Sequence, residues 1–396
     1  MTFILLAVIY ITFICIGVPE SLFGAAMEAI GKEFALGEAA NLVSTLVTTI
    51  VYGCTALASV LAARVINRFG TYAVTAISVL LMAFTLLGFS FAPNIIIMYL
   101  LAIPLGVGSG AINASLNNYI ALHFSAKHMN FLHCFYGAGT IISLEFMSRM
   151  LANEDWRGGY RAAFMLQAGI ALIVIVSLPL WKKKSNTAQS GDEEVTPRTL
   201  SILEMAKNSS IRTAWIMCIS TNAIEALCGV LGAKYLIHVH GMSDSASADA
   251  LMFYFVGMTL GRFLSGVLAD KLGSWRMIRI CIYILTVAVV MLLLPLGIPA
   301  LSIAALAFIG FANGPIYPNI MNLAPQNFGR NVSGSVIGTQ MATAYFGVML
   351  APPLFGIIAD AASIALLPVM LAVWLALLII GTVILIKKLK AQGRYR

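Results

Sequence analysis

Two glutamates carry the chemistry that is easiest to recognise in this chain. Glu20 begins the segment Glu20-Ser-Leu-Phe-Gly24, and Glu225 begins the similar segment Glu225-Ala-Leu-Cys-Gly229. Both lie in long apolar stretches, where an ionisable side chain is costly and usually has a function. A carboxylate there suits reversible uptake and release of a proton. We expect Glu20 and Glu225 to be proton-coupling groups; for each, the alternative is a structural bond between helices.

A second group of polar side chains lies between residues 113 and 136. Asn113 and Asn117 are four residues apart and so share one face of a helix, as do His133 and Tyr136 at a spacing of three. Each amide can donate and accept hydrogen bonds, which suits a solute rich in hydroxyl groups. His133 is a third proton-coupling candidate because histidine titrates near neutral pH. We predict all four as substrate contacts, with hydrogen bonds to neighbouring helices as the alternative.

Three residues of the second half complete the predicted substrate site, together with Glu20. Asn222 precedes Glu225 by three residues on the same helical face. Tyr317 combines a flat apolar ring with a hydroxyl group, and the prolines on either side of it should loosen the helix there. Gln340 adds an amide in the following apolar stretch. None of these residues belongs to a nucleophile or metal-binding motif, so we expect no enzyme activity, no cofactor and no metal site.

One loop has the composition of a gate. The second half reads Gly261-Arg262-Phe263-Leu264-Ser265-Gly266-Val267-Leu268-Ala269-Asp270-Lys271-Leu272-Gly273-Ser274-Trp275-Arg276. Glycines allow helices to approach closely, and the charges can pair at a membrane surface. The first half has a reduced counterpart, Asn67-Arg68-Phe69-Gly70. We predict gating roles for Gly266, Asp270, Lys271, Arg276 and Arg68; the alternative is that these charges only set the topology.

Twelve apolar stretches must position these side chains. The chain has 396 residues, 60% of them hydrophobic and 10% charged, which excludes an ordinary soluble domain. Each stretch is about 20 residues or longer and must be helical to satisfy its backbone in lipid. The predicted spans are 3–30, 40–63, 71–91, 94–121, 130–151, 160–181, 212–238, 247–268, 275–295, 299–323, 332–354 and 364–387. The predicted class is an all-α membrane protein.

An internal repeat divides these twelve helices into two pseudo-symmetric six-helix bundles. The repeat pairs Gly106, Gly110, Asn113 and Asn117 with Gly310, Gly314, Tyr317 and Met321, all at an offset of 204 residues. A polar stretch containing Lys182-Lys-Lys and Asp192-Glu-Glu separates the halves. We therefore predict bundles at 1–181 and 212–396, joined by a cytosolic linker at 182–211.

The net charge of +8 orients the protein. Most Lys and Arg residues fall in the linker, the tail and the loops that face the same side when twelve spans are threaded. By the positive-inside rule, both termini are cytoplasmic in a cell membrane, and we expect a bacterial inner membrane. The excess of basic residues is thus explained by orientation in the lipid bilayer, which we expect to be a partner of this protein. We expect no binding of nucleic acid.

The loop from Gly261 to Arg276 resembles the signature loop of the major facilitator superfamily. Within it, the chain resembles the fucose permease group of sugar–proton symporters, in the motifs Gly261-Arg262-Phe263, Ile316-Tyr317-Pro318-Asn319-Ile320 and Pro353-Leu354-Phe355-Gly356. Glu20 falls where that group carries an Asp in span 1. The resemblance implies the major facilitator fold and places Tyr317 at the sugar site. Three positions depart from the group: Asn113 replaces its span-4 carboxylate, His133 a Gln and Tyr136 an Asn.

These observations together predict a monomeric secondary transporter. The leading hypothesis is proton-coupled uptake of a monosaccharide or similar small polar solute by alternating access. A drug or metabolite efflux antiporter is the alternative, supported by the 19 methionines. A receptor or scaffold that binds a ligand without moving it is a third possibility, which explains the gate-like loop less well.

Overall fold

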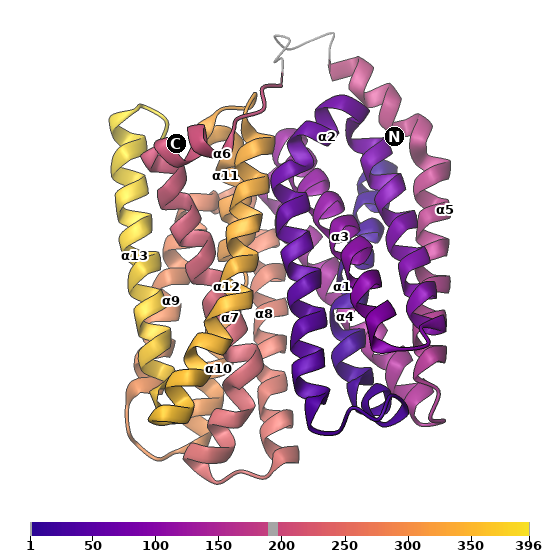
Figure 1. The fold of residues 1–396 in the computed structure, drawn as a ribbon. Helices are drawn as coiled ribbons and strands as arrows, with labels where there is room; N and C mark the ends of the chain where they lie inside the picture. The colour runs from indigo at the N-terminus through magenta and orange to yellow at the C-terminus, as the bar shows by residue number, and fades with distance from the viewer. Residues whose placement is uncertain (1, 189–196, 396) are drawn as a thin grey trace. The chain divides into compact units, whose positions relative to one another are not determined.

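The computed structural model describes residues 2–188 and 197–395, and within them all regular structure is helical. The chain forms two compact units (Figure 1). The first unit comprises Met1–Tyr119 with Leu132–Thr199, and the second comprises Ile120–Phe131 with Leu200–Arg396. The boundary at Thr199 lies inside the predicted linker. Residues 189–196 of that linker lie outside the described residues.

Five long helices make up the first unit, except for the segment Ile120–Phe131, which belongs to the second unit. They are α1 (Thr2–Glu33), α2 (Ala40–Phe91), α3 (Ile95–His123), α4 (Ala126–Leu151) and α5 (Trp156–Ala188), with a 3₁₀ turn, η1 (Gly37–Ala39), before α2. The end of α3 and the start of α4 fall in that segment of the second unit. Gly70 interrupts α2 with φ 80° and ψ 154°, a conformation that suits glycine, so α2 contains two spans. The first unit therefore has six spans.

The second unit begins with a short helix and continues with the remaining spans. Its elements are α6 (Ile202–Lys207), α7 (Ser209–His240), α8 (Asp244–Leu272), α9 (Ser274–Leu293), α10 (Pro299–Asn313), α11 (Ile316–Phe328), α12 (Ser333–Ala361), η2 (Ile364–Leu366) and α13 (Leu367–Ala391). The predicted loosening around Tyr317 is confirmed, since the span breaks into α10 and α11 at Gly314 and Pro315. The described residues thus contain twelve spans, as predicted.

One detail differs from the sequence prediction: helix α5 continues to Ala188, well into the predicted linker. The short helix α6 also lies inside the linker and ends at Lys207, and Ser201 and Glu204 form a capping box at its start. Ten stretches of the described chain are individually long and apolar enough to cross a membrane, one of which holds both spans of α2. Helix α4 is not among them because it carries several polar and charged side chains in its length.

The glycine repeat has the same packing role in both units. In the first unit, a Cβ added at Gly106 or Gly110 of α3 would collide with a backbone carbonyl of α2. In the second unit, Gly310 of α10 meets the Tyr254 carbonyl of α8 in the same way, and a Cβ at Gly314, the C-cap of α10, would come within 2.9 Å of the side chain and carbonyl of Met258. Only glycine permits helices to approach so closely. The repeat therefore preserves one helix contact in each unit.

Candidate functional site

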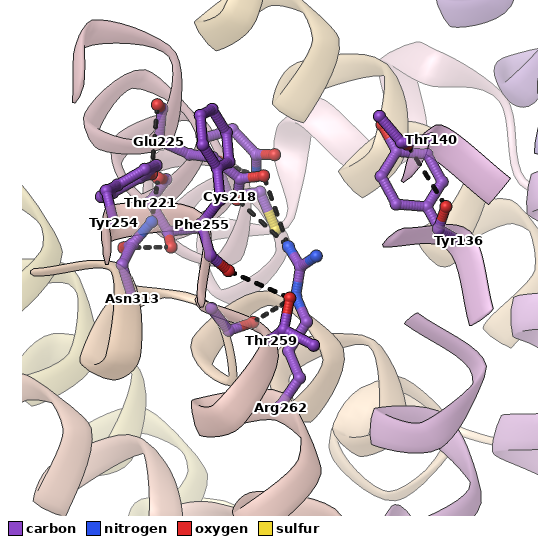
Figure 2. A network of polar contacts seen from close by, with 12 residues as sticks. Tyr136, Thr140, Cys218, Thr221, Glu225, Tyr254, Phe255, Thr259, Arg262 and Asn313 are labelled. Atoms are coloured by element: carbon purple, nitrogen blue, oxygen red, sulfur yellow. Dashed lines mark hydrogen bonds and ion pairs between the residues drawn. The ribbon is translucent and has the colours of Figure 1, made fainter. Parts of the chain in front are cut away.

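A buried ion pair joins α7 and α8 of the second unit (Figure 2). Arg262 Nη2 lies 3.3 Å from each carboxylate oxygen of Glu225. Arg262 also donates from Nε to the carbonyl of Gly314, at 3.2 Å. The side chain of Arg262 is only 7% exposed, whereas that of Glu225 is 29% exposed. The cation is therefore enclosed by protein, and the carboxylate keeps an open side.

Neighbouring hydrogen bonds hold this pair in place. The Tyr254 hydroxyl donates to the backbone carbonyl of Glu225 at 3.2 Å. One turn earlier on α7, Thr221 donates to Asn313 Oδ1 at 2.7 Å, and Asn313 Nδ2 returns a bond to the Thr221 carbonyl at 2.9 Å. Because both partners in this exchange are buried and satisfied, they anchor α7 to α10. Figure 2 shows these contacts around Glu225.

A partly exposed face of α7 runs past the ion pair. Asn222, Glu225 and Gly229 are each half-buried and lie at the spacing expected for one helical face, as predicted for the first two. Asn222 Nδ2 donates to the carbonyl of Cys218 at 2.9 Å. Tyr317 of α11 is buried. The second unit thus places two predicted site residues, Asn222 and Glu225, on one partly exposed face of α7.

The first unit gathers a separate chain of polar side chains. Asn117 Nδ2 donates to Asn113 Oδ1 at 2.6 Å and to the Asn113 carbonyl at 2.9 Å. His133 Nε2 lies 3.2 Å from Asn117 Oδ1, and that oxygen can only accept, so Nε2 carries the proton in this arrangement. The ring of Phe13 meets the ring of His133 edge-on, with centroids 5.3 Å apart. Three predicted residues from two helices therefore form one buried network.

Glu20 and Tyr136 lie on helices that are in close contact. A Cβ at Gly17 of α1 would collide with the backbone of α4 at Tyr136 and come within 2.9 Å of the Thr140 nitrogen. Thr140 donates to the Tyr136 carbonyl at 3.3 Å, as drawn in Figure 2. Glu20 follows Gly17 by three residues and is half-buried, as is Tyr136. Pro19 lies inside α1 directly before Glu20.

Gln340, another predicted substrate contact, lies in a different environment from the rest. It is fully buried on α12, and neither its Oε1 nor its Nε2 has a hydrogen-bond partner among the described residues. A buried amide with two unpaired ends is unusual and unfavourable.

The predicted gating residues occupy the helix ends. Arg68 lies on α2, and Asp270, Lys271 and Arg276 lie around the junction of α8 and α9; all four are exposed. Gly266 is buried, and a Cβ there would come within 2.6 Å of the Phe131 ring. This aromatic ring belongs to the segment Ile120–Phe131, which is part of the second unit. The missing side chain of Gly266 therefore leaves a notch, which here means the space that the Phe131 ring occupies.

Sequence reasoning missed the role of Arg262. The Gly-Arg-Phe motif drew attention to Arg262, but the sequence alone does not predict that α8 contacts α7. One signal was available: a carboxylate within a span usually has a named partner. No three His, Cys, Asp or Glu side chains of the described segments gather closely enough to hold a metal ion.

Helices long enough to span a bilayer, with charged and amide groups enclosed between them, define a multi-pass membrane protein. The family model of the Major Facilitator Superfamily matches residues 9–352. The chain therefore belongs to the Major Facilitator Superfamily, a family of membrane transporters.

Individual relatives agree with this assignment. An uncharacterised transporter of the same superfamily from Bacillus subtilis is 24% identical over 291 residues, 72% of each chain. A cis,cis-muconate transport protein from Acinetobacter baylyi is 22% identical over 314 residues, 76% of this chain and 74% of the relative. A structure of the fucose:proton symporter of E. coli matches with a TM-score of 0.76 at 15% identity, covering 96% of this chain and 98% of that one. At that identity, the likeness shows the fold alone.

Proposed function

We propose that this transporter couples the uptake of a monosaccharide, or a similar small polar solute, to the movement of protons. The observation that carries this proposal is the network of Asn113, Asn117 and His133, three buried hydrogen-bonding side chains in an apolar unit. Such groups complement hydroxyls, because each amide offers a donor and an acceptor.

Glu20 is the proposed proton carrier. It is half-buried within α1, next to a proline. A proton moving with the membrane potential supplies about 2.3 kcal/mol per 100 mV, enough to drive accumulation of a neutral solute. We infer a cell-membrane location with both termini in the cytoplasm, and a monomer that needs only its lipid, its solute and protons.

Transport assays in proteoliposomes test this function. Radiolabelled sugars are offered to the purified protein in counterflow, first without and then with an inward proton gradient. We expect exchange in both cases, but accumulation only with the gradient. The Glu20→Gln variant should still exchange sugar and should fail to accumulate it. Glu145→Gln is the matched control, because Glu145 is an exposed glutamate that pairs with Arg149 at 2.6 Å.

Two outcomes would count against the proposal in different ways. Accumulation by Glu20→Gln equal to that of the unmodified protein refutes the coupling role of Glu20. Gradient-driven extrusion of solute in place of uptake would favour the efflux antiporter. A small organic acid is a second candidate substrate, which the Acinetobacter relative favours, and muconate is therefore included among the labelled solutes.

A further inference from the structure

The ion pair of the second unit places a hydrogen-bond acceptor and a hydrogen-bond donor side by side. Glu225 offers carboxylate oxygens on a half-exposed side chain. Arg262 uses Nη2 for Glu225 and Nε for Gly314, and its Nη1 makes no hydrogen bond among the contacts of the described residues. The Nη1 end of the guanidinium therefore has hydrogen-bonding capacity that these contacts do not use.

The pair is held loosely enough to admit a ligand. Both Nη2–oxygen distances are 3.3 Å, longer than the roughly 2.7–2.9 Å of a tight charge-assisted bond. Ionised carboxylate oxygens have about four lone-pair sites between them, so the contact with Nη2 leaves some of them free. Each charged group thus retains hydrogen-bonding capacity beyond its partner.

Space for a ligand lies on the same face of α7. One turn beyond Glu225, Gly229 has no side chain, and a Cβ there would meet only the ring of Phe255, at 3.7 Å. One turn before Glu225, Asn222 is half-buried, and its bond to the Cys218 carbonyl uses only its nitrogen. A carboxylate acceptor, a guanidinium donor and an amide oxygen therefore lie together at this half-exposed face of α7.

The charge of this position favours one class of ligand. The negative charge of Glu225 and the positive charge of Arg262 cancel, so the pair is neutral as a unit. A ligand carboxylate would add an uncompensated negative charge beside an enclosed pair, which is strongly unfavourable. A hydroxyl group adds no charge and can both donate to Glu225 and accept from Arg262.

We propose that the Glu225–Arg262 pair binds two neighbouring hydroxyl groups of an uncharged sugar, and that Arg262 Nη1 is a substrate-specificity determinant. This inference rests on the proposed function and narrows it to neutral vicinal diols. One hydroxyl donates to a Glu225 oxygen while its neighbour accepts from Nη1. A purely structural pair would instead tie α7 to α8 without touching substrate.

Equilibrium binding to the purified full-length protein tests the inference independently of transport. The neutral probes are D-glucose, D-galactose, L-fucose and D-xylose, and the acidic counterparts are D-glucuronate and D-galacturonate. Thermal stabilisation as a function of ligand concentration reports the Kd of each. We expect at least one neutral sugar to bind and the corresponding hexuronate to bind at least tenfold more weakly.

The Arg262→Lys variant separates recognition from charge. Lysine keeps the positive charge opposite Glu225 but lacks the second donor edge of the guanidinium. We expect the Kd for the neutral sugar to rise at least tenfold. Thr259→Ala is the matched control: Thr259 lies one turn earlier on α8 and bonds only the carbonyl of its own helix, so the Kd should stay within twofold.

A second variant covers the case in which Arg262→Lys does not fold. Asn222→Ala leaves the ion pair intact and should raise the Kd at least threefold. The inference is overturned if none of the neutral sugars binds, if a hexuronate binds as tightly as its neutral counterpart, or if the folded variants keep the original Kd. Sugar binding with these losses but without proton-driven accumulation would support the inference while refuting the proposed coupling.

Discussion

Glu225 and Arg262 should depend on each other for stability. The losses of unfolding free energy in the two single variants should add up to more than the loss in the double variant. In Glu225→Gln the guanidinium loses its counter-ion while its side chain is only 7% exposed, so water cannot replace the carboxylate. Uncompensated buried charges cost about 3–5 kcal/mol. Glutamine still offers Nη2 an acceptor oxygen, so we expect the lower end, about 3 kcal/mol.

In Arg262→Met, a different set of free-energy contributions decides the loss of stability. The remaining carboxylate has a side chain that is 29% exposed and is therefore partly hydrated, but the bond from Nε to the Gly314 carbonyl is lost. We expect about 2 kcal/mol, since a hydrogen bond to a charged donor contributes roughly 1.5–3 kcal/mol. The double variant leaves no buried charge and should lose about 3 kcal/mol, well short of the sum of the singles, with a coupling energy of about 2 kcal/mol.

The measurement is a double-mutant cycle of unfolding free energies, from reversible titration with a denaturing detergent. The matched control is the cycle on Glu145 and Arg149, an exposed pair at 2.6 Å, which should give a coupling below about 0.5 kcal/mol. A coupling energy for Glu225 and Arg262 as small as that of the exposed pair would refute the reasoning, because the two charges would then be hydrated independently.

Three further changes test other parts of the structure. Gly310→Ala drives a methyl group into the backbone of Tyr254 and should cost about 1–3 kcal/mol, whereas Gly53→Ala meets nothing within 4 Å and should be neutral or slightly stabilising by thermal unfolding. Arg157→Ala removes bonds to the Ser90 and Ala92 carbonyls and to Glu33, and should cost about 2 kcal/mol; Lys32→Ala, in a pair with both side chains over 70% exposed, should change the unfolding free energy by less than about 0.5 kcal/mol. Gly266→Val displaces the Phe131 ring and should slow sugar exchange in proteoliposomes with the Kd unchanged; exchange at the original rate would contradict a gating role for this notch.

The helices could be predicted from the sequence because each span has to satisfy its own backbone in lipid. All twelve spans were predicted from apolar length, and the one that matches α4 is the most polar of them, since α4 carries His133 and Tyr136. The prolines around Tyr317 correctly indicated a broken span. The continuation of α5 to Ala188 was not predicted, because lysine, serine and asparagine in that stretch resemble a solvated linker.

The candidate site was predictable only where it depends on spacing within one helix. Asn113 and Asn117 form the expected pair, and Asn222 and Glu225 share the expected face. Contacts between helices were not predictable in this way. His133 reaches Asn117 from another helix, and Arg262 meets Glu225 across 37 residues of sequence, a separation with no helical period. Such pairs depend on how the helices pack, and residue spacing along the chain does not reveal that packing.

Proton movement driven by sugar is the most direct test of the central claim. Proteoliposomes containing a pH-sensitive dye are given an inward gradient of a neutral sugar that binds, with no pH gradient imposed. Proton-coupled uptake predicts that the lumen acidifies as sugar enters, and that Glu20→Gln admits sugar without acidification. Sugar entry through the unmodified protein with no change in luminal pH would contradict the account.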